Sequence, residues 1–136
     1  MKILQILTEK RKIGNIGERA AARLLKKAGY KILKRNYVAL GYEIDIIASD
    51  REHTVFCEVK TRTLGKENPN EPRPASSVTP EKQRKIISVA KYYNANKNAG
   101  RKMRFDIIEV FVDDEKTVKK AVHLIGAFNY NTANKG

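Results

Sequence analysis

Two acidic residues and a lysine have the types and spacing that phosphoryl-transfer chemistry requires. Residues 43–48 (EIDIIA) and 54–60 (TVFCEVK) are apolar and rich in β-branched residues, as strands are, and a polar turn separates them. The two segments are therefore expected to pair as an antiparallel hairpin. Because side chains alternate along a strand, Glu58 and Lys60 share one face of the second strand. Alternation in the first strand predicts one face with Glu43, Asp45 and Ile47, and another with Ile44, Ile46 and Ala48.

The hairpin makes Asp45 and Glu58 neighbours in either of two registers. A loop at residues 50–53 places them directly opposite each other, and a shorter loop places them on a diagonal. Like charges at these positions destabilise a sheet, and a hard divalent cation bound by their oxygens offsets the repulsion. Asp45 and Glu58 are thus expected to bind Mg²⁺ or Mn²⁺, with Lys60 orienting a water molecule or stabilising charge on a phosphate. A solvated strand edge would carry the same Glu-x-Lys triplet, so the residues alone leave a structural interpretation open.

Composition favours a polyanionic partner. The 136 residues include 28 Lys and Arg against 15 Asp and Glu, a formal net charge of +13. Such an excess indicates nucleic acid rather than a membrane surface, because no segment has the pattern of a basic amphipathic anchor. A basic surface with another use is the alternative. The single cysteine, Cys57, has apolar neighbours and is expected in the core, and the chain lacks a signal peptide or membrane span, so a soluble, cytoplasmic protein is expected.

The remaining segments predict one domain over residues 1–136. The expected elements are a helix over Asn15–Ala28 that Asn15 caps, a strand over Tyr30–Tyr37, a helix from Pro80 to about Asn96, and strands over Arg104–Val112 and Thr117–Ile125. Residues 64–78 are expected to form a mobile loop, and residues 129–136 a polar tail. With the hairpin, this order predicts an α/β fold with a mixed central sheet of about five strands flanked by helices.

Several blocks of the sequence resemble a known family. GYEIDIIASDREHTVFCEVKTR is similar to the core of the PD-(D/E)xK nuclease superfamily, which includes restriction endonucleases and archaeal Holliday-junction resolvases. GNIGERAAARLLKKAGYKIL, EIDIIA, VFCEVKTR and RFDII together resemble the YraN-like family of uncharacterised bacterial proteins, from about Gly14 to Phe128. Two positions depart from these patterns: Ile44 stands where the superfamily name has a proline, and Tyr42 separates Gly41 from Glu43.

The resemblance implies a restriction-endonuclease-like fold and assigns roles to individual residues. Asp45 and Glu58 correspond to the metal-binding carboxylates, Lys60 to the catalytic lysine, and Glu18 to a helix acid that completes the metal site. Glu18 also fits a capping box with Asn15, which is a structural alternative.

Gln83 and six basic residues are further candidates for the site. Gln83 is expected on the inner face of the second helix, where it could contact a metal-bound water or a phosphate, as a similarly placed glutamine does in RecB-like nucleases; a hydrogen bond to the backbone is the alternative. Phosphate contacts are expected from Arg62, Lys66, Arg73, Lys82, Arg84 and Lys85, each of which fits a solvated surface equally well. Asp106 is expected to pair with a nearby Arg or Lys, and Glu43 either to tune the site or to lie at its rim.

The sequence therefore predicts a Mg²⁺- or Mn²⁺-dependent endonuclease that acts on DNA, with branched or otherwise structured DNA as one candidate substrate. A non-catalytic nucleic-acid-binding module on the same scaffold is the first alternative, because a fold does not determine a function. A basic adaptor for an acidic protein partner is the second. Since junction-cutting relatives act as two-fold dimers, a homodimer is also expected.

Overall fold

The computed structural model describes residues 3–66, 78–97 and 101–134. The elements in these ranges are α1 (Ile3–Lys27), β1 (Lys31–Ala39), β2 (Tyr42–Ser49), β3 (His53–Thr63), α2 (Pro80–Lys97), β4 (Lys102–Val112), β5 (Val118–Phe128) and α3 (Tyr130–Ala133). The predicted order of helix, three strands, helix and two strands is confirmed. No helix in the described ranges is both long and apolar enough to cross a membrane.

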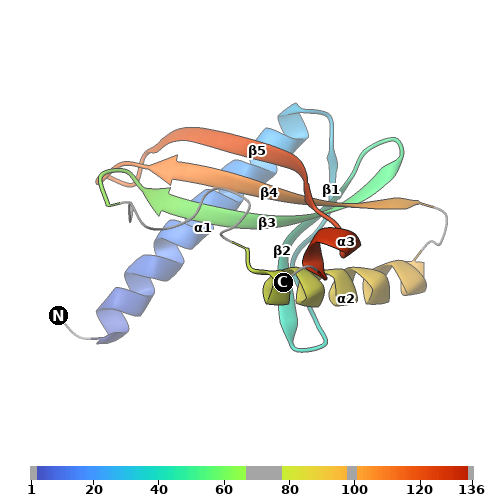
Figure 1. The fold of residues 1–136 in the computed structure, drawn as a ribbon. Coiled ribbons are helices and arrows are strands. Elements are labelled where there is room, and N and C mark those ends of the chain that lie inside the picture. The colour runs from blue at the N-terminus through green and yellow to red at the C-terminus, as the bar shows by residue number, and fades with distance from the viewer. Residues whose placement is uncertain (1–2, 67–77, 98–100, 135–136) are drawn as a thin grey trace.

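The strands form one mixed sheet in the order β1-β2-β3-β4-β5 (Figure 1). β3 and β4 are parallel, and the other neighbouring pairs are antiparallel. The parallel pair requires a crossover connection, and α2 lies in that connection. In the hairpin, Ser49 pairs with Thr54, so four residues, 50–53, separate the paired positions and the first of the two predicted registers is confirmed. The architecture is α/β and restriction-endonuclease-like, as predicted.

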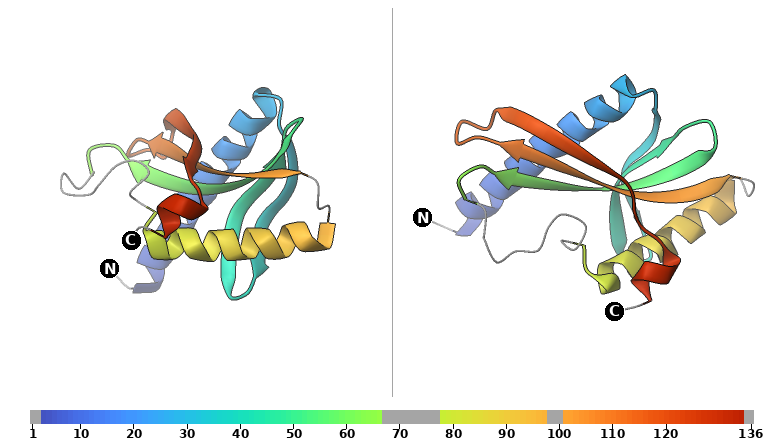
Figure 2. Two further views of the ribbon diagram at one scale, coloured as in Figure 1. Left: turned by 45° about the vertical axis from the view of Figure 1, so that its right-hand side comes forward. Right: turned by 45° about the horizontal axis from the view of Figure 1, so that its top comes forward.

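Helices cover both faces of the sheet (Figures 1 and 2). On one face, α1 buries Ala21 and Leu25 against Ile46, Val55 and other strand residues. This cluster also contains Cys57, and its predicted place in the core is confirmed.

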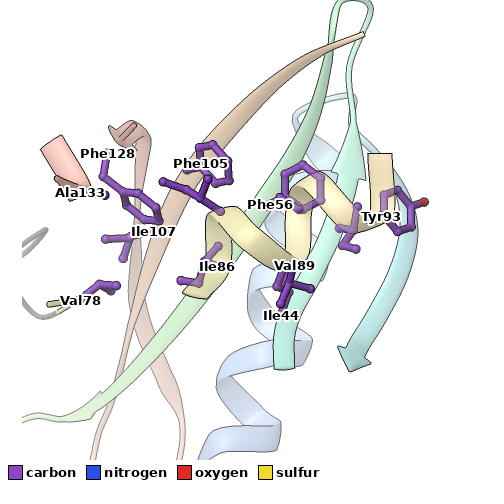
Figure 3. Packing of buried hydrophobic residues seen from close by; sticks show 13 residues of the cluster. Ile44, Phe56, Val78, Ile86, Val89, Tyr93, Phe105, Ile107, Phe128 and Ala133 are labelled. Carbon is purple, nitrogen blue, oxygen red and sulfur yellow. The ribbon is translucent and has the colours of Figure 1, made fainter. Parts of the chain in front are cut away.

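The cluster on the opposite face is larger and rich in aromatic rings (Figure 3). The inner face of α2 contributes Ile86, Val89, Ala90 and Tyr93, as its apolar spacing predicted. Phe56 on β3 stacks on Phe105 of β4, and the next stacked pair joins Phe105 to Phe128 on β5. These contacts connect the strands of the sheet to the helix that crosses them.

The helix predicted to begin at Asn15 begins at Ile3 instead. Asn15 therefore lies within α1 and does not cap it, so the capping-box interpretation of Glu18 is wrong. The sequence favoured a late start because Asn15 and Glu18 have the spacing of a capping box. Gly17 is required by packing: a Cβ atom there would lie 1.8 Å from Oγ1 of Thr61 on β3. The helix thus approaches β3 more closely than any larger residue would allow.

The C-terminal segment also differs from the prediction. Residues 130–133, expected within a polar tail, form α3, which Asn129 and Thr132 cap through reciprocal hydrogen bonds. Ala133 is fully buried in the cluster on the α2 face. Most of the loop predicted for residues 64–78 lies outside the described residues, although the Leu64 amide, within the described part, donates to the Val112 carbonyl at 2.8 Å.

Candidate active site

The candidate site lies where β2 and β3 separate. Their backbone pairing runs from Ser49–Thr54 to Ile46–Cys57 and ends there. Beyond that point a side chain replaces the backbone as acceptor: Oδ2 of Asp45 accepts a hydrogen bond of 2.8 Å from the Val59 amide. The side chain of Asp45 thus spans the opening between the strands.

Strict alternation fails along β2, contrary to the prediction. Ile44 lies with Ile47 in the cluster on the α2 face, whereas Ile46 lies in the cluster on the α1 face. Asp45 approaches Glu18 of α1, so the successive residues Asp45 and Ile46 both lie on the α1 face of the sheet. This irregularity turns the acid toward the helix without exposing the flanking isoleucines.

Three carboxylates from three separate segments meet at this point. One oxygen each from Glu18, Glu43 and Asp45 lie within 4.8 Å of one another. Nδ2 of Asn36 on β1 donates to Glu18 at 2.8 Å and to Glu43 at 3.0 Å. Asn36 has a φ of 54°, in the left-handed region that asparagine tolerates better than most residues. Glu43, expected either to tune the site or to lie at its rim, belongs to this three-acid group.

The fourth carboxylate, Glu58, interacts with Asp45 across the opening. It also accepts a hydrogen bond of 3.2 Å from the Tyr42 hydroxyl. Burial, followed by the hydrogen bond and charge of Glu58, raises the pKa of Asp45 to about 8. Burial also raises the pKa of Glu18, with smaller contributions from the charges of Asp45 and Glu43. Negative charge is therefore costly here unless a cation is close by.

The acids open onto a pocket of about 410 Å³. Glu18, Asp45 and Lys60 line it, and the first half of α1 closes it with Lys10 and Ile13. A donor set made entirely of carboxylate oxygens suits Mg²⁺ or Mn²⁺, which prefer hard oxygen ligands. The residues present therefore fit the metal that the resemblance implies, and Lys60 brings a fixed positive charge to the same pocket.

Glu58 lies beside Asp45 but does not line this pocket, and neither do the remaining sequence candidates. Gln83 is buried and donates from Nε2 to the Val78 carbonyl at 2.9 Å, which is the backbone alternative considered for it. Arg62 forms a largely buried ion pair with Glu109 on β4. Arg84 donates to the Ala133 carbonyl at 2.6 Å.

The other basic candidates lie at the surface or outside the described ranges. Lys85 lies 3.6 Å from Glu81 in an exposed ion pair. Lys66 and Lys82 are exposed, and Arg73 lies outside the described residues. The structure thus brings Glu18, Asp45, Glu58 and Lys60 close together, and it adds Lys10, Asn36 and the hydroxyl of Tyr42, which the sequence analysis did not select. The true start of α1 would have pointed to Lys10; the contacts of Asn36 have no local signal.

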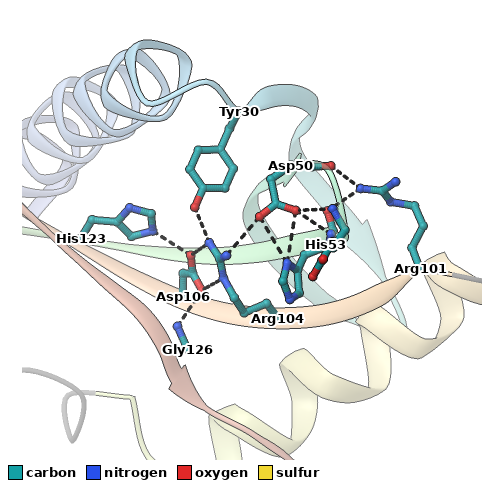
Figure 4. Close-up of polar contacts among 9 residues, drawn as sticks. Tyr30, Asp50, His53, Arg101, Arg104, Asp106, His123 and Gly126 are labelled. Carbon is teal, nitrogen blue, oxygen red and sulfur yellow. Dashed lines mark hydrogen bonds and ion pairs between the residues drawn. The ribbon is translucent and has the colours of Figure 1, made fainter.

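A second cluster of charged side chains lies under α1, around Asp106 (Figure 4). Arg104 donates to both carboxylate oxygens of Asp106, at 3.0 and 2.8 Å, which confirms the predicted pairing. Nε2 of His123 lies 2.7 Å from Oδ2, and the Gly126 amide donates to Oδ1 at 3.0 Å. Burial alone would raise the pKa of Asp106, but the hydrogen bonds from His123 and Arg104 outweigh it and lower the pKa.

Known proteins resemble the chain along most of its length. The model of "Uncharacterised protein family UPF0102" matches residues 17–110. A UPF0102 protein of Caldanaerobacter subterraneus is 43% identical over 121 residues, covering 88% of this chain and 96% of the relative. The Moorella thermoacetica relative is 41% identical, covering 88% and 97%. The Desulfosudis oleivorans relative is 42% identical, covering 94% and 98%. The family match and these identities agree with the resemblance found in the sequence blocks, and the chain belongs to the UPF0102, or YraN-like, family.

Proposed function

We propose that this protein is a Mg²⁺- or Mn²⁺-dependent endonuclease that hydrolyses phosphodiester bonds of DNA. The observation that carries the proposal is the environment of Asp45: it is a partly buried carboxylate with a raised pKa, it has three acidic neighbours, and it shares a pocket with Glu18 and Lys60. A fold has little reason to keep four acids together unless a cation joins them.

The residues have distinct roles in this proposal. Asp45 would hold the metal together with Glu18 and Glu58, and Glu43 would hold Glu18 in place through the shared amide of Asn36. When bound, the metal would polarise the scissile phosphate and make a bound water more acidic. Lys60 would hold the attacking water or stabilise the charge that develops on the phosphate. The hydroxyl of Tyr42 would fix the orientation of Glu58.

The direct test is cleavage by the purified protein of linear, single-stranded, flapped and four-way DNA with Mg²⁺ or Mn²⁺. Asp45→Asn should abolish cleavage and most of the thermal stabilisation by Mn²⁺, because it removes the central ligand. Lys60→Ala should abolish cleavage while retaining much of that stabilisation, because lysine does not ligate the metal. Cleavage that survives in both variants would come from a contaminant.

Two other outcomes point to the alternatives. DNA binding without cleavage of any substrate would identify a non-catalytic binding module. Binding to an acidic protein, with indifference to DNA even at low salt, would identify an adaptor, because phosphate contacts should strengthen as salt is lowered. We further propose a homodimer, since two sites are needed to cut paired strands, and light scattering at micromolar concentration would measure the mass.

A further inference from the structure

A second groove adjoins the acid site on the side of α2. It has a volume of about 360 Å³ and lies between the tip of the β1–β2 hairpin and the first half of α2. Tyr42 belongs to both places, because it lines this groove while its hydroxyl contacts Glu58. A chain bound across Glu58 could therefore continue directly into the groove.

The groove combines apolar and cationic walls. The hairpin contributes Leu40 and Tyr42, and α2 contributes Val89 and Ser88 together with two cations, Arg84 and Lys85, and one acid, Glu81. Leu40 is 64% exposed, so its apolar surface is available to a ligand. A nucleotide has matching chemistry, since its base has an apolar face and its phosphate is anionic.

The hairpin presents Leu40 in a constrained conformation. Leu40 has a φ of 53° and Gly41 a φ of 74°, so two successive residues adopt the left-handed region. A leucine in this region costs free energy that a glycine would not. Val38 near the same tip is also 64% exposed. The tip thus carries apolar side chains toward solvent where polar residues would be the ordinary choice.

We propose that this groove binds an unpaired nucleotide next to the phosphate that is cleaved. The proposal rests on the nuclease function and adds a substrate class to it. In a duplex, both faces of a base are stacked and its edge is paired, so the base cannot contact Leu40 and Tyr42 until it leaves the helix. The two cations of the groove outnumber its single acid, Glu81, so the phosphate backbone of either form is attracted to it. The groove therefore selects DNA that has single-stranded character at the cut.

Binding without metal tests the groove separately from the chemistry. In EDTA, a fluorescent single strand, a blunt duplex and a duplex with an unpaired flap are titrated with wild type, Leu40→Ser and a control, Ile125→Ser. Ile125 is 61% exposed on β5, so the control removes a similar apolar surface elsewhere. Leu40→Ser should weaken single-strand and flap binding about tenfold and leave duplex binding unchanged. The control should bind all three DNAs like wild type.

A second measurement uses the absence of tryptophan from the chain. Leu40→Trp and Ile125→Trp each introduce a single indole, which a stacked base should quench. Quenching by the single strand at position 40, and none at position 125, would support the groove. Equal losses by both serine variants, an equal loss for duplex and single strand, or equal quenching at both positions would overturn it. Failure of cleavage alone, with this binding pattern intact, would count against the nuclease function and not against the groove.

Discussion

Two aspartates of the sheet, the buried Asp106 on β4 and the partly buried Asp45 on β2, have opposite surroundings. Asp106 is fully buried, and it receives hydrogen bonds from an arginine, a histidine and a backbone amide. Asp45 accepts a backbone hydrogen bond from the Val59 amide, and its close charged neighbours include Glu18, Glu43 and Glu58. Accordingly, the pKa of Asp106 is lowered and that of Asp45 is raised to about 8.

This difference separates a charge that the fold compensates from one that it does not. Donors already within the fold compensate the charge of Asp106, so its ionised form stabilises the protein. The charge of Asp45 lacks such compensation, and the proposed cation would supply it. A fold that retains the second arrangement accepts a cost in stability, which is typical of sites that bind ligands.

The largest expected effect comes from neutralising the structural aspartate. Asp106→Asn should lower the free energy of unfolding by about 3–5 kcal/mol, because Arg104 and His123 would remain buried beside a neutral group. Urea denaturation followed by circular dichroism measures this change. A loss of unfolding free energy below about 1 kcal/mol would mean that the hydrogen bonds around Asp106 contribute little to the stability of the fold.

The matching change at Asp45 should have the opposite sign. The folded pKa lies above the unfolded value, so the contribution of Asp45 to stability is complete below about pH 4 and is lost as the pH rises through about 8. Asp45→Asn removes this loss, and in EDTA at pH 9 it should be more stable than wild type, by on the order of 3 kcal/mol. At pH 4 the two proteins should be nearly equal.

The pH series also contains its own control. The pKa of Asp106 is lowered, so its contribution is present above the ordinary aspartate pKa and is lost as the pH falls through the folded value. Wild type and Asp45→Asn should lose stability in the same way at acid pH, because both retain Asp106. If the difference between them does not grow between pH 5 and pH 9, Asp45 is not held in the environment described here.

The sequence was sufficient where local pattern decides the structure. Strand composition and a polar turn predicted the β2–β3 hairpin, and Thr79-Pro80-Glu81 predicted the start of α2. It was insufficient where the deciding contact is distant. Arg62 was expected to reach a phosphate, but its partner is Glu109, which only the parallel pairing of β3 with β4 brings near.

Helix α1 is the clearest case of such a distant contact. It was predicted to begin at Asn15 and begins at Ile3, and the glycine at position 17 is required by the side chain of Thr61 on β3. The carboxylate of Glu18 reaches Asp45 because the preceding residue has no side chain. Local propensity carries no information about that approach.

A pair of glycine substitutions tests this packing. Gly17→Ala should destabilise the protein by about 1–3 kcal/mol and weaken Mn²⁺ binding, because the new methyl group would displace α1 from β3. Gly14→Ala is the control: a Cβ atom there meets nothing within 4 Å, and alanine should stabilise the helix by up to about 1 kcal/mol. Thermal denaturation with and without Mn²⁺ gives both quantities. Equal effects of the two substitutions would show that helix propensity alone is being measured.

The smallest expected effect concerns the amide that holds two of the acids. Asn36 and Leu40 have nearly the same left-handed φ, 54° and 53°, so glycine at either position relieves a similar backbone cost. Only Asn36→Gly also removes the donor shared by Glu18 and Glu43. Mn²⁺ affinity, measured by calorimetry, should therefore fall about tenfold in Asn36→Gly and remain unchanged in Leu40→Gly. If neither variant changes the affinity, the left-handed conformation of Asn36 matters only for the course of the β1 backbone. In that case α1 and β2 position Glu18 and Glu43 without the Asn36 amide.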